Sequence, residues 1–84
     1  MDITIDNKTA QTLASVVRFH RKKSGLSQSQ LAKLAGIGKT TVFDIEKQKP
    51  TVRLNNLLAV LSVLNIRINL ESPLMSFFEK EEFK

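Results

Sequence analysis

The sequence predicts a small, mainly α-helical domain that ends in a single β-strand. Two glycines, Gly25 and Gly36, separate stretches in which apolar residues recur at helical spacing. Leucines then repeat at helical spacing over about residues 53–64, and residues 66–71 change to strict alternation of apolar and polar side chains. The period of an apolar pattern distinguishes helices from half-buried strands, so this change marks the end of the helical part.

Size and composition predict one domain with no disulfide, metal or cofactor. The 84 residues are 42% hydrophobic, enough for one compact core, and include no cysteine and a single histidine. Within residues 1–84 we expect a core over about residues 9–65, a strand over about residues 66–71 and a tail over 72–84. No secretion signal is evident and no apolar run approaches ~20 residues, which predicts a cytoplasmic protein without a membrane span.

Positive charge is concentrated in the middle of the chain. The net charge is +5, but residues 18–53 alone contain nine basic residues against Asp44 and Glu46, a local charge of +7. The last six residues are slightly acidic. A basic block of this kind fits a surface that binds a polyanion, and it equally fits a solvated basic surface.

Capping signals delimit the first two predicted helices. Thr9 is a suitable N-cap for a helix over about residues 10–23, and Gly25 stands where a left-handed residue ends a helix. Ser27 and Gln30 form the S-x-x-Q pattern of a capping box, which predicts a second helix that ends at Gly36. The expected inner faces comprise Leu13, Ala14, Val16, Val17, Leu31, Ala32 and Ala35.

Two more helices are predicted before the strand. A third helix over about residues 38–48 directs Val42 and Ile45 inward, with Thr41 beside them, and Pro50 ends it because residues before proline avoid helical angles. A fourth helix over about residues 53–64 carries the strongest periodic pattern in the chain. Its leucine face consists of Leu54, Leu57, Leu58, Leu61 and Leu64.

The alternating segment predicts a dimer. Ile66, Ile68 and Leu70 share one face of a half-buried strand over residues 66–71. A lone strand cannot satisfy its backbone hydrogen bonds, so it pairs either with residues 3–5 of the same chain or with the same strand of a second copy. We favour the two-fold pairing, because isologous contacts are the commonest in oligomers, and we include Leu64 in the predicted interface.

Residues 36–41, GIGKTT, look like the end of a nucleotide-binding phosphate loop, but that interpretation fails. The phosphate-loop pattern requires a glycine five residues before Gly38, where this chain has Lys33. The preceding residues are also helical in pattern, whereas a phosphate loop follows a strand. No nucleophile–base pair, metal-ligand cluster or pair of acids converges elsewhere, so the sequence does not predict an enzyme.

The same residues fit a helix-turn-helix. Two short helices joined by a turn that contains glycine form this motif, and its second helix enters the major groove of DNA. Ala32 is small enough for close helix crossing, Gly36 supplies the turn, and Ile37 is an apolar residue between the helices. The stretch GLSQSQLAKLAGIGKTTVFDIEK resembles the Cro and phage-repressor (XRE) family, over about residues 18–64. The resemblance implies a five-helix lambda-repressor-like helix-turn-helix domain, all-α apart from one C-terminal β-strand that pairs across a homodimer.

This resemblance implies a set of DNA-contacting residues. Gln28 matches the position where the N-terminus of the second helix meets a phosphate. On the outward face of the recognition helix, Lys39 is expected to donate to guanine, Asp44 to accept from cytosine, and Thr40 or Phe43 to contact a thymine methyl. For each lysine the alternative is simple solvation. The full predicted DNA-binding set is Gln28, Gly38, Lys39, Thr40, Thr41, Phe43, Asp44, Lys47, Lys49, Thr51 and Arg53.

Four further positions can be compared with the XRE pattern. Arg21 and Glu46 match a family pair that forms an internal ion pair, so we interpret them as structural. The family often has glycine where this chain has Gln48, and a larger side chain where this chain has Gly38. We therefore expect differences at the exit of the third helix and in the DNA contacts near its start.

The C-terminal half, LNNLLAVLSVLNIRINLE, resembles the HipB antitoxins, in which a helix runs directly into a dimer-forming strand. The resemblance implies a repressor that autoregulates its operon, binds a roughly palindromic operator and holds a HipA-type kinase toxin inactive. Such a protein is nucleoid-associated when bound to DNA. The alternatives are a phage-type or general XRE repressor without a toxin partner, and a protein-interaction adaptor that has lost DNA binding.

The tail predicts one more short helix that begins near Ser72 and Pro73. Its apolar residues are candidates for binding a protein partner, because aromatic side chains often anchor interfaces. Alternatively, they fold back and complete the dimer core. A membrane-surface helix is disfavoured by the short length and the acidic charge. The partner-binding candidates are Leu74, Phe77, Phe78 and Phe83.

Overall fold

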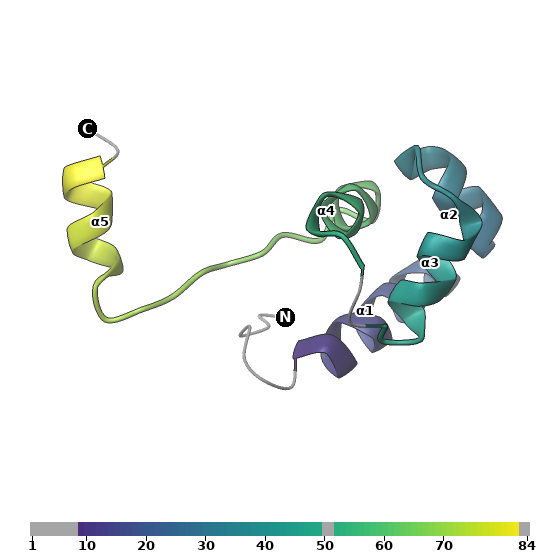
Figure 1. Cartoon of the computed structure of the whole chain (residues 1–84), viewed down its shortest axis with the longest axis horizontal. Helices are drawn as coiled ribbons and strands as arrows, with labels where there is room; N and C mark the ends of the chain where they lie inside the picture. Colours follow the sequence, from purple (N-terminus) through teal and green to yellow (C-terminus); the bar gives the residue numbers. More distant parts are fainter. Residues whose placement is uncertain (1–8, 50–51, 83–84) are drawn as a thin grey trace.

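The part of the chain that the structure describes forms five α-helices (Figure 1). The computed structural model describes residues 9–49 and 52–82. The helices are α1 (Thr9–Lys23), α2 (Gln28–Ala35), α3 (Lys39–Glu46), α4 (Leu54–Val63) and α5 (Met75–Glu82). Residues 3–5, Thr51 and Phe83, to which the sequence assigned roles, lie outside the described residues. The all-α, five-helix class is confirmed, and none of the described helices is long and apolar enough to cross a membrane.

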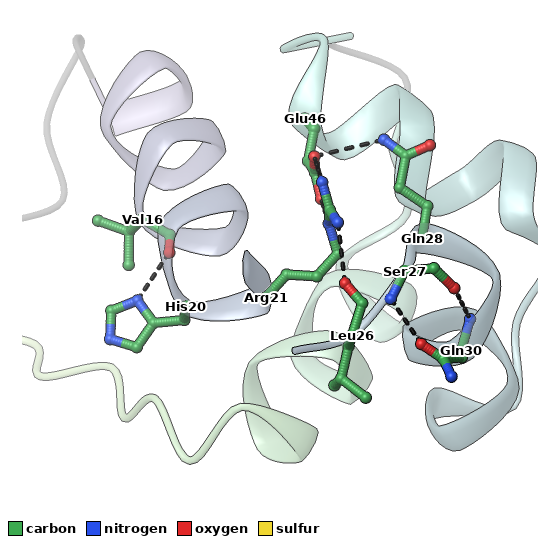
Figure 2. Close-up of polar contacts among 8 residues, drawn as sticks. All are labelled: Val16, His20, Arg21, Leu26, Ser27, Gln28, Gln30 and Glu46. Carbon is green, nitrogen blue, oxygen red and sulfur yellow. Dashed lines mark hydrogen bonds and ion pairs between the residues drawn. The ribbon is translucent and has the colours of Figure 1, made fainter. Parts of the chain in front are cut away.

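The predicted capping box at the start of α2 is present. The Ser27 hydroxyl accepts a hydrogen bond from the backbone N–H of Gln30 at 3.0 Å. In return, the Gln30 side-chain oxygen accepts from the backbone N–H of Ser27 at 2.8 Å (Figure 2). Two backbone donors that a helix leaves unpaired are thereby satisfied, which fixes α2 to begin at Gln28.

Helices α1 to α4 each end on a residue in the left-handed region, at Gly25, Gly36, Gln48 and Asn65, with φ between 58° and 72°. At Gln48 the backbone N–H donates to Ile45 O, and the next N–H, of Lys49, donates to Asp44 O. This pair of bonds is the Schellman motif, for which glycine is preferred. Gln48 therefore turns the chain out of α3 as a glycine would, and it bears the backbone strain of that conformation.

The core lies among α1, α2, α3 and α4. Helix α2 packs against both α3 and α4, and α1 packs against α3. Ile37, the apolar residue of the turn, is half-buried against this core, as predicted. The buried cluster consists of Val17, Leu31, Ala32, Val42, Ile45, Val60, Leu61 and Leu64.

The leucine face of α4 does not coincide with the face that packs on the core. Leu61 and Leu64 are buried, together with Val60, which the leucine pattern did not single out. Leu54 and Leu58 are 64% and 43% exposed. Because α4 carries apolar residues on most of its sides, the period alone did not show which side faces inward. One flank of this helix is left as an apolar surface.

Beyond α4 the chain runs as an extended segment to α5, which stands apart from the other helices (Figure 1). Ile66 and Ile68 are half-buried against the core, whereas Leu70 is 67% exposed. Within residues 9–49 and 52–82 no strand is formed, so the strand over residues 66–71 and its pairing across a dimer stay predictions. Leu74, just before α5, and Phe77, on α5, are 69% and 63% exposed in the single chain.

Candidate nucleic-acid interface

A bidentate ion pair fixes the recognition helix α3 against α1. The Arg21 guanidinium donates from Nε to Glu46 Oε2 at 2.7 Å and from Nη2 to Glu46 Oε1 at 3.0 Å. A third donor, Nη1, bonds the backbone oxygen of Leu26 at 3.0 Å (Figure 2). The two side chains are 11% and 5% exposed, and the hydrogen bonds to Glu46 raise the pKa of Arg21. The predicted structural role of this pair is confirmed.

Gln28, the first residue of α2, joins the same carboxylate. Its side-chain Nε2 donates to Glu46 Oε1 at 3.3 Å, so side chains of α1 and α2 both bond to Glu46 of α3 (Figure 2). The Gln28 side chain thus serves the packing of the three helices. A phosphate contact at this position, which stays a prediction, would use the backbone amides at the start of α2.

The outer face of α3 is open. Lys39 and Thr40 are exposed, Phe43 is 43% exposed, and Thr41 is half-buried. Gly38 precedes the helix with extended backbone angles, and a Cβ added there would meet nothing within 4 Å. The free protein therefore does not need glycine at position 38 for its own fold. A glycine there leaves room for a closely approaching ligand.

Just after α3, two basic side chains contact residues that are predicted to bind DNA bases. The Lys47 ammonium lies 5.5 Å from the centroid of the Phe43 ring, a cation–π contact. Lys49 Nζ lies 3.5 Å from Asp44 Oδ1, with side chains 58% and 23% exposed. Such solvent-exposed pairs are weak. Asp44 is therefore held only weakly by Lys49, and its predicted contact with cytosine stays a prediction.

A hollow of about 230 Å³ lies beside this face. Gln28, Phe43 and Lys47 line it together with the Arg21–Glu46 pair, and so does Arg18. Arg18 belongs to the basic block of residues 18–53 but is not among the predicted DNA-binding residues. The available signal was spacing, since Arg18 precedes Arg21 by three residues and so lies on the same side of α1. Arg53, at the start of α4, is also exposed.

Comparison with known proteins agrees with this geometry. A helix-turn-helix family model matches residues 17–70. An uncharacterized HTH-type transcriptional regulator, y4mF, of Sinorhizobium fredii (strain NBRC 101917 / NGR234) is 36% identical over 66 residues, which are 79% of this chain and 87% of that protein. Control protein C.SmaI of Serratia marcescens is 33% identical over 58 residues, 69% of each chain.

Among solved structures, a chain of the HipA-HipB-O2-O3 complex superposes with a TM-score of 0.71 and 25% identity. The match covers 84% of this chain and 97% of that one. The resemblance to XRE-type regulators and to HipB is thus confirmed at the level of sequence family and fold. The chain belongs to the helix-turn-helix family of DNA-binding transcriptional regulators.

Proposed function

We propose that this protein is a dimeric transcriptional repressor that acts as the antitoxin of a HipBA-like toxin–antitoxin module and autoregulates its operon. The observation that carries the repressor part is the open outer face of α3, presented on a helix that the Arg21–Glu46 pair holds in place. A recognition helix that is both exposed and rigidly positioned is suited to reading base edges in the major groove.

In this proposal the residues that contact DNA divide into two groups. Lys39 and Thr40, at the first turn of α3, read bases together with Phe43. Lys47, Lys49 and Arg53 contact the DNA backbone, where they set affinity and salt dependence. Arg18 joins this second group, because it lines the hollow beside Phe43 and Lys47.

The proposed dimer forms through residues 66–70. In an antiparallel pair, directly opposed residues share one face, so the apolar face stays continuous when Ile68 opposes its own copy and Ile66 opposes Leu70. This pairing covers Leu70, which is 67% exposed in the single chain. Two recognition helices related by a two-fold axis fit half-sites about one DNA turn, ~34 Å, apart, so the operator is roughly palindromic.

The antitoxin part is supported by the fold that the chain shares with HipB, which was solved in a complex with HipA. By analogy, the proposed partner is a HipA-type kinase toxin. The exposed tail residues Leu74, Phe77 and Phe78 are one candidate surface for a partner. Phe83, the fourth tail candidate, lies outside the described residues.

A gel-shift assay on the region upstream of the protein's own gene tests the repressor proposal. We expect selective binding to that region over random DNA of equal length, with affinity that falls steeply as salt rises. Binding that is absent, or equal on both DNAs, would contradict the repressor and favour an adaptor that has lost DNA binding.

A regulator without a toxin partner is the second candidate, and similarity to Control protein C.SmaI favours it. Affinity purification of the tagged protein from its native cells, followed by mass spectrometry, separates the two. A HipA-type kinase recovered in stoichiometric amount supports the antitoxin. Recovery of the dimer and DNA alone, under conditions in which the operon is expressed, supports the plain regulator.

A further inference from the structure

We infer that α5 is exchanged between the two copies of the dimer, so that its apolar side packs into a groove beside α4 of the partner copy. This inference rests on the proposed pairing of residues 66–70. It assigns the occupant of the groove, and it packs the tail into the dimer, which is the alternative to the partner-binding role of the tail considered above.

The groove lies between α4 and the extended segment that follows it. Its volume is about 420 Å³. Leu58, 43% exposed on the outer flank of α4, forms one apolar wall, and the half-buried Ile66 and Ile68 form the other. The remaining lining residues are Leu61, Ser62, Asn65 and Arg67. The groove therefore has apolar walls with polar residues between them, and Arg67 is its basic residue.

Helix α5 carries a matching surface. Leu74, just before the helix, and Phe77, one turn into it, lie on one side and are 69% and 63% exposed. Apolar side chains that cluster on one side of a helix gain stability when they pack into an apolar site. The two surfaces thus agree in polarity.

The segment between them favours an extended path that leads α5 away from the groove of its own chain. All glycines of the protein lie at or before Gly38, so none lies in the segment after α4. Ile66 and Ile68 are β-branched and favour extended backbone, and Pro73 restricts the residue before it to extended angles. Eight extended residues, 66–73, span roughly 25 Å. Figure 1 shows the result, with α5 carried away from α4.

The proposed two-fold pairing directs α5 to the partner copy. When Ile68 opposes its own copy in an antiparallel pair, residues beyond Leu70 of one chain pass alongside residues before Ile66 of the other. Those residues form the end of α4, where Ser62 and Asn65 line the groove. Each copy therefore gives one α5 and receives one, which closes the assembly as a symmetric dimer.

Cross-linking between two marked copies tests the exchange. The chain contains no cysteine, so single cysteines are specific labels. A size-tagged Ser62→Cys protein is mixed with an untagged Lys80→Cys protein, the subunits are allowed to exchange, and a short bis-maleimide is added. We expect a cross-linked species of mixed size as the main product. Ser29→Cys, exposed on α2 outside the groove, replaces Ser62→Cys as the matched control and should give no such product.

The double variant Ser62→Cys/Lys80→Cys distinguishes exchange from folding back. Exchange gives covalent dimers on a denaturing gel, whereas a cross-linked monomer would show that α5 returns to its own chain and would overturn the inference. A dimer by light scattering that binds the operator but forms no cross-link overturns the exchange alone. A monomer by light scattering overturns the proposed dimer and the exchange together.

A second measurement is independent of the cross-linker. Phe77→Ser should raise the dissociation constant of the dimer at least about tenfold, the loss expected for an aromatic anchor at an interface. Ser76→Ala, on the opposite side of α5, should leave the constant unchanged. An unchanged constant for Phe77→Ser, with the helical circular dichroism spectrum retained, contradicts the inference.

Discussion

The Arg21 guanidinium and the Glu46 carboxylate meet in two parallel hydrogen bonds, of 2.7 and 3.0 Å, between α1 and the last residue of α3. Because Gln28 of α2 donates to the same carboxylate, one acidic side chain joins the three helices that build the DNA-reading unit. The angle at which α3 is presented therefore depends on a largely buried contact among the three helices.

Glu46→Gln should lower the free energy of unfolding by about 3 kcal/mol, because it leaves a largely buried guanidinium without its counter-charge. Urea denaturation measures the loss. The matched control is Lys49→Ala, which breaks the exposed pair with Asp44 and should change stability by less than about 0.5 kcal/mol. Equal losses in the two variants would show that burial of the Arg21–Glu46 pair is not what makes it important.

The pH dependence of the stability that Glu46→Gln loses follows from the raised pKa of Arg21. A raised pKa in the folded state gives stability that is fully present below the unfolded pKa and is lost only as pH rises through the folded value. Both values for arginine are strongly alkaline. The difference between wild type and Glu46→Gln should therefore be the same at about pH 7 and about pH 9.

Gln48→Gly should raise the free energy of unfolding by about 1 kcal/mol, because Gln48 holds φ at 64°, where side chains with a Cβ are strained. Asn65→Gly should give a smaller gain, since asparagine tolerates the left-handed region better than glutamine. Gln48→Ala retains the Cβ and should gain little. Thermal or urea unfolding ranks the three variants, and a loss of stability in Gln48→Gly would exclude strain at this turn.

Local chemistry in the sequence predicted most of the helical part. Some signals involve only residues close together in the sequence, so the sequence pattern alone locates them. These signals are the capping box of Ser27 and Gln30 and the left-handed glycines Gly25 and Gly36. The Arg21–Glu46 contact spans 25 residues and was expected only because the XRE family resemblance pairs these positions. No local rule brings those two residues together.

Two features depend on packing that a single sequence pattern does not encode. The five leucines between residues 54 and 64 repeat at helical spacing, yet Leu54 and Leu58 are exposed while Val60 is buried, because neighbouring helices decide which side faces inward. Alternation over residues 66–71 indicates an extended, half-buried segment, but a strand also needs a partner backbone. Among the residues that the structure describes, no backbone pairs with residues 66–71.

Lys39→Ala should weaken binding to the operator relative to random DNA by about 1–3 kcal/mol if Lys39 reads a base. Lys39 is exposed at the first residue of α3, so the substitution should leave stability nearly unchanged. Fluorescence anisotropy on operator and random duplexes at matched salt provides the comparison. Lys33→Ala, exposed on α2, is the control and should affect both DNAs little. Equal weakening on both duplexes by Lys39→Ala would assign Lys39 to a phosphate.

Leu70→Asp should convert the dimer to a folded monomer. In the proposed pairing Leu70 opposes Ile66 of the partner copy, so a carboxylate there would be buried without a counter-charge. Leu70 is the most suitable position on the apolar face of the segment, because it is 67% exposed in the single chain and contributes little to the core. Light scattering should report the monomer mass while the helical circular dichroism spectrum is retained.

Two further variants test whether the loss of the dimer is specific to the apolar face of the segment. Ile68→Asp should also give monomers but should lower the melting temperature as well, because Ile68 packs against the core of its own chain. Asn69→Asp places the same charge one residue away on the opposite, polar face, and it should leave the dimer intact. If Leu70→Asp stays dimeric, residues 66–70 do not form the two-fold contact, and the dimer must use another surface, of which the exposed Leu54 flank of α4 is the first to test.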